Sequence, residues 1–152
     1  MEYMFLPFKR YFDFQGRSRR MEFWMFVLMN IIVYLVLAMI VFGTGAGLSA
    51  FEGVDPEDTL GIYGALFNGT GILFGIWWLV TFIPTISVSV RRFHDRDMSG
   101  WWYLGVIVGS LIPYLGVIVS LGYLVFMALP GTEGPNRFGP DPKNPTSADV
   151  FE

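Results

Sequence analysis

Three long apolar blocks decide what this chain can fold into. They run from about residue 23 to 42, from 70 to 90 and from 101 to 129. An α-helix needs roughly 20 apolar residues, at about 1.5 Å each, to cross the hydrocarbon core of a bilayer. The chain of 152 residues is 53% hydrophobic and only 15% charged, whereas a soluble domain carries about 25% charged residues. The sequence therefore predicts an all-α, polytopic membrane protein.

The first two blocks each have the length of one span. Trp24 lies at the start of the first block, where aromatic rings favour the membrane interface, and Asn30 lies within it. An amide in hydrocarbon gains roughly 1 kcal/mol from a partner on another helix. We therefore expect Asn30 to face protein rather than lipid. Pro84 predicts a kink in the second block.

The third block, residues 101 to 129, is too long for a simple span, because one helix of this length measures roughly 43 Å against a core of about 30 Å. It forms either one span kinked at Pro113, for three spans in all, or a hairpin that turns at "PYLG", for four segments. Small residues spaced four apart occur in the second and third blocks: Gly71, Gly75, Gly116 and Ser120. Such spacing lets helices approach closely and slightly favours the single span.

The two ends of the chain are expected to differ from these blocks. An amphipathic helix over about residues 7 to 15 is predicted to lie in the membrane interface, with aromatic side chains toward lipid and cations toward headgroups. Residues 130 to 152 are rich in proline and glycine and have no apolar period, which predicts an irregular tail. Residues 1 to 129 are thus expected to form a single membrane domain.

Positive charge is distributed unevenly along the chain. Basic residues precede the first block and follow the second: Lys9, Arg10, Arg17, Arg19, Arg20, Arg91, Arg92 and Arg96. Residues 43 to 69 contain acidic residues but neither lysine nor arginine. Because basic residues near the ends of spans stay in the cytoplasm, the amino terminus and residues 91 to 100 are predicted to be cytoplasmic, with residues 43 to 69 in the periplasm.

Two charged stretches, "FQGRSRRMEFW" and "RRFHDRDMSGWW", should then face each other at the same membrane surface. They supply the candidate binding residues: Arg17, Arg20, Glu22, Arg91, Arg92, His94, Asp95, Trp101 and Trp102. A carboxylate at the membrane edge is costly unless it is paired, and Arg91 or Arg92 is the predicted partner of Glu22. No catalytic residue is predicted, because no nucleophile accompanies His94 at a recognisable spacing. One histidine and no cysteine leave no metal site, and no cofactor is expected.

Together with "PGTEGPNRFGPDP" near the end of the chain, these stretches resemble the DUF805 family of small bacterial inner-membrane proteins. The resemblance covers about Phe14 to Pro142, and Asp97 stands where the family often has glycine. It implies a multi-pass protein of the bacterial inner membrane and transfers no catalytic residue. It also suggests that the three motifs act as a unit. In that case the tail residues Asn136, Arg137 and Asp141 would lie beside the other charged stretches. A hairpin in the third block would return the tail to that side, so this argument favours the hairpin, whereas the spacing of the small residues favours the single span.

The preferred functional hypothesis is a non-enzymatic membrane protein whose cytoplasmic cluster of arginine, histidine and aspartate binds an anionic partner. That partner would be lipid headgroups or a segment of another membrane protein, including a second copy of this chain, and no nucleic acid is expected. An oligomeric transporter or channel component is the second hypothesis, although the blocks contain no charged residue of the kind that marks ion routes. A lipid-modifying enzyme using His94 and Asp95 is the third.

Overall fold

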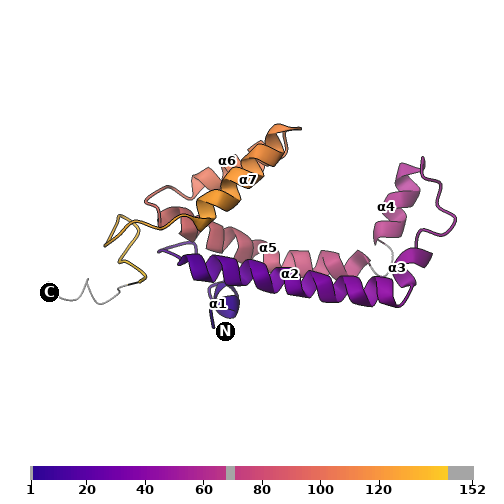
Figure 1. Ribbon diagram of the computed structural model, residues 1–152, viewed down its shortest axis with the longest axis horizontal. Coiled ribbons are helices and arrows are strands. Elements are labelled where there is room, and N and C mark those ends of the chain that lie inside the picture. The colour runs from indigo at the N-terminus through magenta and orange to yellow at the C-terminus, as the bar shows by residue number, and fades with distance from the viewer. Residues whose placement is uncertain (1, 68–70, 144–152) are drawn as a thin grey trace. The chain divides into compact units, whose positions relative to one another are not determined.

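The computed structural model of the protein describes residues 2 to 67 and 71 to 143. These residues form seven helices and no strand, which confirms the all-α prediction (Figure 1). The helices are α1 (Glu2–Lys9), α2 (Arg20–Gly43), α3 (Ala46–Ser49), α4 (Thr59–Phe67), α5 (Gly71–His94), α6 (Trp101–Ser110) and α7 (Leu115–Ala128). The contacts divide the chain into two compact units, and α2 and α5 each contribute to both. Unit 1 contains described residues 2 to 27 and 83 to 143, and unit 2 contains 28 to 67 and 71 to 82.

In unit 2, α2 and α5 pack in antiparallel order. The indole Nε1 of Trp77 donates a hydrogen bond of 3.0 Å to the Oδ1 atom of Asn30. Four residues further along α2, the ring of Tyr34 stacks on Phe74 with the ring centroids 6.1 Å apart. The prediction that Asn30 faces another helix is therefore confirmed. α2 and α5 are both long and apolar enough to cross a membrane; Thr70, where the second span was predicted to begin, lies outside the described residues.

Changing Trp77 to Phe should destabilise the contact between α2 and α5 slightly. The ring keeps most of its apolar surface, but the donor to Asn30 is lost, and hydrogen bonds between membrane helices contribute about 0.6 to 1 kcal/mol. Thermal unfolding in detergent micelles should therefore show a decrease of a few degrees in Tm. Trp78→Phe is the matched control, because no hydrogen bond is recorded for the Trp78 indole in the described part of the chain, and the account is wrong if both variants lose the same stability.

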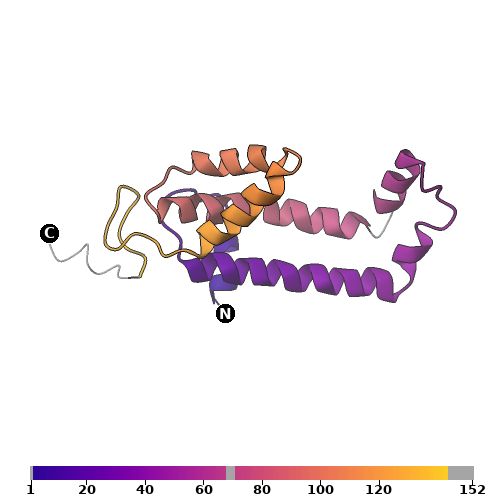
Figure 2. The ribbon, with the colours of Figure 1, turned by 45° about the horizontal axis from the view of Figure 1, so that its top comes forward.

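In unit 1 the third apolar block forms a hairpin, and the alternative of one span kinked at Pro113 is wrong. α6 and α7 lie side by side and run in opposite directions (Figures 1 and 2). The chain turns at Tyr114, whose φ is 63°, and the amide of Gly116 donates to the carbonyl of Ile112 at 2.8 Å. A Cβ atom at Gly116 would lie 2.3 Å from the carbonyl oxygen of Ser110. Gly116 therefore serves the turn of the hairpin and not, as its spacing suggested, close packing against the second block.

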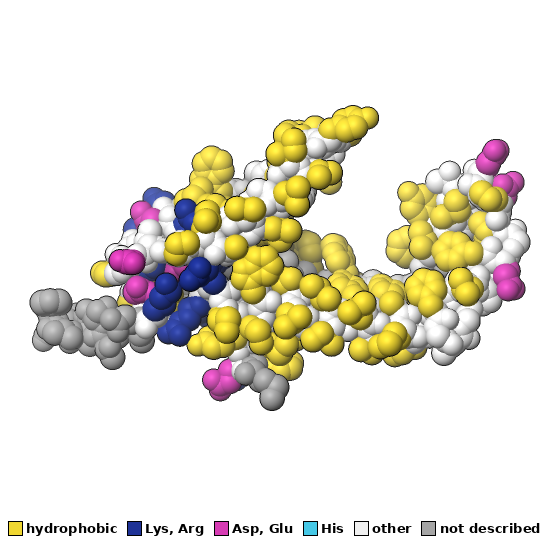
Figure 3. Space-filling model, in the orientation of Figure 1, with side chains coloured by type: hydrophobic (Ala, Val, Ile, Leu, Met, Phe, Trp, Pro, Cys, Tyr) yellow, Lys and Arg dark blue, Asp and Glu magenta, His cyan; other side chains and the backbone are white. Residues whose placement is uncertain are grey.

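The hairpin exposes apolar side chains along its whole length. α6 has 10 residues and α7 has 14, so each is shorter than the roughly 20 residues that a crossing needs. Large apolar residues are exposed on both arms, for example Leu111, Ile118 and Val125. Figure 3 shows hydrophobic side chains covering the outside of α6 and α7. Such a surface is stable only against lipid or another apolar partner.

The helix at the amino terminus lies earlier than the sequence predicted. α1 covers Glu2–Lys9, not residues 7 to 15, and Pro7 lies inside it and is buried. Asp13 explains where the helix stops. Its carboxylate accepts hydrogen bonds from Arg10 Nε at 2.8 Å and from the amide of Gln15 at 3.0 Å, which form a turn in place of further helix.

Candidate functional site

A buried cluster of charged side chains lies where α2 begins and α5 ends in unit 1. We call it the arginine cluster, and its members are Arg17, Glu22, Arg91, Arg92 and Asp95. Arg91 and Arg92 are fully buried, and none of the five residues is more than 6% exposed. Figure 3 shows further basic side chains on the surface at this end of unit 1. Charges buried to this degree require partners, so each contact within the cluster bears on what it can do.

Asp95 is shared between two arginines. Its Oδ1 atom lies 3.0 Å from Arg17 Nε, and its Oδ2 atom pairs with Arg92 Nη1. The side chains of Arg17 and Arg92 are 1% and 0% exposed, and that of Asp95 is 6% exposed. Arg92 and Asp95 lie three residues apart at the end of α5, which places them on the same helix face. A single carboxylate thus compensates two guanidinium groups that solvent cannot reach.

Arg92 also closes the end of α7. Its Nε atom donates to the carbonyl of Met127 at 3.2 Å, and its Nη2 atom donates to the carbonyl of Leu129. The last carbonyls of a helix have no partner within the helix, and a cation near them interacts favourably with the helix dipole. Arg92 therefore joins the end of α5 to the end of the hairpin.

The tail begins as part of the same cluster. Arg17 donates to the carbonyls of Gly134 through Nη1 and Thr132 through Nη2, both at 2.6 Å. The amide of Thr132 donates to the backbone carbonyl of Asp95 at 2.9 Å. A Cβ atom at Gly131 would lie 1.9 Å from Asp95 Oδ2, so only glycine fits at this point. The sequence predicted that the membrane domain ends at residue 129 and that the tail begins at residue 130. These contacts join the two parts.

Glu22 and Arg91 form a second buried pair. Arg91 Nη1 lies 2.9 Å from Glu22 Oε1, with the side chains 0% and 3% exposed. The predicted pairing across the membrane edge is thus confirmed, with Arg91 as the partner. Arg91 Nη2 is also buried and has no hydrogen-bond partner among the described residues. The charges of Arg91 and Glu22 compensate each other, but the N–H donors of Arg91 Nη2 have no acceptor among the described residues.

His94 is held between the amino-terminal segment and the tail. Its Nδ1 atom lies 3.2 Å from the carbonyl oxygen of Gly16, and its ring stacks on Phe138 with the centroids 3.9 Å apart. Its backbone carbonyl accepts a hydrogen bond of 2.9 Å from Asn136 Nδ2. These contacts use His94 as a packing residue between the two segments.

Of the three tail residues expected to join the other charges, Asn136 and Arg137 contact residues 94 and 97, whereas Asp141 accepts hydrogen bonds from amides of the tail itself. Arg137 pairs with Asp97 at 3.2 Å and also donates to its backbone carbonyl at 2.7 Å. Asp97 has a φ of 57°, so it adopts the left-handed conformation usual for glycine. Asp141 accepts from the amides of Lys143 and Gly134, and these bonds hold the pKa of its carboxyl below the usual value.

The other predicted site residues lie at the surface. Arg20 is exposed and donates to the carbonyl of Ala128 at 3.3 Å. Trp101 and Trp102, at the start of α6, are 78% and 59% exposed. The structure therefore divides the nine predicted residues into five that are buried, three that are exposed, and His94, which is half-buried. It adds Gly131 and Thr132, which the sequence offered only as parts of the tail motif.

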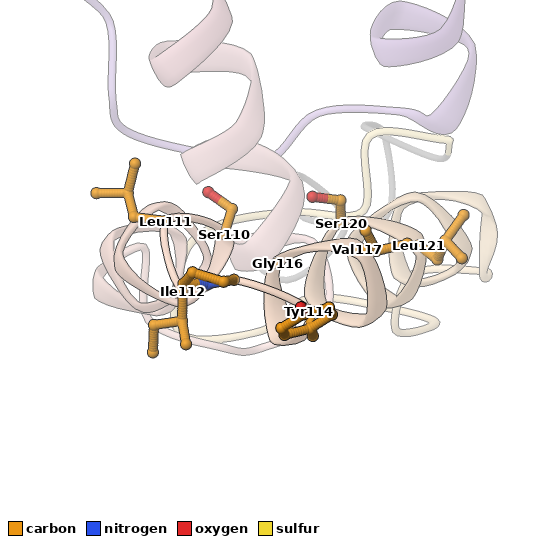
Figure 4. Close-up of a pocket in the computed structure, with 9 residues that line it drawn as sticks. Ser110, Leu111, Ile112, Tyr114, Gly116, Val117, Ser120 and Leu121 are labelled. Carbon is orange, nitrogen blue, oxygen red and sulfur yellow. The ribbon is translucent and has the colours of Figure 1, made fainter.

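A hollow at the turn of the hairpin has no charged lining. It measures about 470 Å³ and lies between the end of α6 and the start of α7. Ser110 and Ser120 point their hydroxyl groups to the same side of the hairpin (Figure 4). Ser110 already donates to the carbonyl of Ile107 at 2.7 Å. Among the residues that the structure describes, no group of acidic, histidine or cysteine side chains could hold a metal ion here or elsewhere.

Comparison with known proteins places these observations in a family. Inner membrane protein YhaH of Escherichia coli (strain K12) is 38% identical over 94% of this chain and 98% of its own length. Inner membrane protein YhaI of the same strain is 34% identical over 94% of this chain and 97% of its own length. No solved structure matches the chain. The model of a protein family of unknown function, DUF805, matches residues 11 to 140, which include every residue of the arginine cluster; the chain belongs to the DUF805 family.

Proposed function

We propose that this chain is a non-enzymatic integral protein of the bacterial inner membrane whose cytoplasmic face binds anionic lipid headgroups. The names of its relatives support the location, since two of them are inner membrane proteins. The length and hydropathy of α2 and α5 support the insertion of both helices. The distribution of basic residues supports an orientation with the amino terminus and residues 91 to 100 in the cytoplasm.

One observation carries the lipid proposal: apart from Arg10 and Arg137, which form ion pairs that solvent reaches, the basic residues of unit 1 fall into two groups. Arg17, Arg91 and Arg92 are buried and paired, so they cannot present donors to a headgroup without breaking the cluster. The other group makes no ion pair with a described carboxylate: Lys9, Arg19, Arg20, Arg96 and Lys143. Each cation near the anionic leaflet adds roughly 1 kcal/mol of attraction. These five residues, which are exposed or half-buried, therefore replace Arg17, Arg91 and Arg92 as the residues that bind lipid.

The proposed topology follows from the hairpin. α2 and α5 cross the membrane, while α6 and α7 are each too short to cross and enter from the cytoplasmic side and return to it. Trp101 and Trp102, exposed at the start of α6, suit the headgroup layer through which the hairpin would enter. The tail then starts on the cytoplasmic side, beside the arginine cluster.

The protein should prefer anionic lipid when offered a mixture. In nanodiscs of equal parts phosphatidylglycerol and phosphatidylcholine, native mass spectrometry should detect more phosphatidylglycerol than phosphatidylcholine on the released protein. Raising the ionic strength should weaken this preference, because salt screens exposed charges. Equal retention of the two lipids at low salt would contradict the proposal.

A transporter or channel finds no comparable support. α2 beyond Glu22 and α5 before Arg91 contain no charged residue, and ion routes through membranes are usually marked by such residues. The buried charges of the arginine cluster, three guanidinium groups and two carboxylates, are held in ion pairs at the ends of the helices. They form a structural element and not a pathway.

A further inference from the structure

A small hollow on unit 1 brings together three of the basic side chains that have no carboxylate partner. It measures about 420 Å³ and is formed by α1, the start of α2, the end of α7 and the tail. Its lining residues are Tyr3, Arg19, Arg20, Met21, Trp24, Ala128 and Lys143. Two guanidinium groups and one ammonium group line it, and none of the described residues that line it carries a carboxylate. Its volume lies within the range of about 300 to 1,000 Å³ that is typical of small-molecule sites.

The two arginines are held in place by uncharged partners. Arg19 Nη1 donates to the hydroxyl of Tyr3 at 3.1 Å, and its Nε atom donates to the carbonyl of Pro142. Arg20 Nη1 donates to the carbonyl of Ala128 at 3.3 Å. Carbonyl and hydroxyl oxygens fix the direction of a guanidinium without cancelling its charge. The two guanidinium groups therefore have fixed directions before an anion binds, and this preorganisation lowers the entropic cost of binding.

The other wall of the hollow is apolar. Met21 is 58% exposed and Trp24 is 37% exposed. Trp24 follows Arg20 by four residues, so the two side chains lie on the same face of α2, with the cation one turn nearer the start of the helix. Tryptophan also favours the boundary between headgroups and acyl chains. A ligand that fits both walls carries a negative charge at one end and a hydrocarbon chain at the other.

We propose that this hollow is a specific site for the phosphate headgroup of one anionic phospholipid. The phosphate would lie between Arg19, Arg20 and Lys143, with an acyl chain along Met21 and Trp24. Arginine matches phosphate oxygens through two parallel N–H donors, which Arg20 can offer. Arg19, whose Nε and Nη2 atoms both donate to the carbonyl of Pro142, contributes its charge, as Lys143 does. This inference rests on the proposed function, because it names the place where an anionic headgroup is held.

The test compares two variants that remove equal charge. In Arg20→Gln with Lys143→Gln, two cations of the hollow are lost. In the control, Lys9→Gln with Arg96→Gln, two cations outside it are lost, of which Lys9 is exposed and Arg96 is half-buried. Binding of phosphatidylglycerol is measured by titrating the full chain in detergent and recording native mass spectra. The first variant should bind the lipid roughly thirtyfold more weakly, at the attraction expected for two cations. The control should stay within about threefold of the unchanged protein, and Tm should be the same for all three.

The outcomes separate the site from the general proposal. Equal weakening in both variants would overturn the specific site while leaving a diffuse attraction to anionic lipid. No preference for phosphatidylglycerol in the unchanged protein would overturn both. Inorganic phosphate at millimolar concentration should not displace the lipid, because it lacks the chain that contacts Trp24. Displacement by inorganic phosphate would overturn the assignment to a lipid and indicate a soluble phosphate compound.

Discussion

Changing Asp95 to Asn is expected to reduce the free energy of unfolding by about 3 to 5 kcal/mol, the usual cost of removing one partner from a buried ion pair. The change keeps the size of the side chain but leaves Arg17 and Arg92 charged, buried and without a carboxylate. Thermal unfolding in detergent should show Tm lower by roughly 6 to 20 °C. Because Arg17 also holds Thr132 and Gly134, the tail should become more sensitive to added protease.

Asp97→Asn is the matched control for this experiment. Asp97 lies two residues away and also pairs with an arginine, but its side chain is 48% exposed and that of Arg137 is 60% exposed. Exposed ion pairs contribute about 0 to 1 kcal/mol. The control should therefore keep nearly all of the stability and the protease resistance of the tail. Equal losses for Asp95→Asn and Asp97→Asn would contradict the importance of burial in this account.

Changing Glu22 to Gln should be similarly damaging, because Arg91 would remain fully buried with no opposing charge nearby at the start of α2. The expected loss is again about 3 to 5 kcal/mol. Thermal unfolding in detergent measures it. Arg91 would keep the long hydrogen bond of 3.4 Å from its Nε atom to the carbonyl of Ser87, while its Nη2 atom has no hydrogen-bond partner among the described residues even when Glu22 is present.

A double-mutant cycle identifies the cause of that loss. Arg91→Met removes the buried charge and keeps a long apolar side chain. Combined with Glu22→Gln it should restore part of the stability, because a buried pair replaced by uncharged residues of similar size often costs little. A coupling of 0.5 to 3 kcal/mol between the two positions is typical of residues in direct contact. Strict additivity of the two single losses would show that the pair does not act as a pair.

The two long helices and the pairing at their ends could be predicted from the sequence, because both depend on local composition. The two long helices are visible as apolar blocks, and Asn30 was expected to meet another helix because an isolated amide in hydrocarbon is unfavourable. Glu22 was expected to pair with an arginine, because a carboxylate at the membrane edge is costly without an opposite charge. In each case one residue is costly without a partner, and the sequence offers few partners.

Burial of the arginines did not follow from the sequence. Arg17, Arg91 and Arg92 were expected to bind an anionic partner at the cytoplasmic surface. Arg17 and Arg92 are buried because backbone carbonyls at the end of α7 and in the tail supply acceptors, and a sequence does not show where such carbonyls lie. Arg91 is buried against Glu22. The choice between hairpin and span was equally hidden, since it depends on the turn at Tyr114 and the close contact at Gly116.

The central claim is that the arginine cluster binds the tail on the same membrane side as residues 91 to 100. The natural chain has no cysteine, so single cysteines introduced at the exposed positions Asp97 and Glu133 can report their side through a membrane-impermeant maleimide. Both should be unlabelled in intact spheroplasts and labelled after the membrane is permeabilised. Labelling of Glu133→Cys in intact spheroplasts, with Asp97→Cys still protected, would place the tail across the membrane from the cluster and contradict the account.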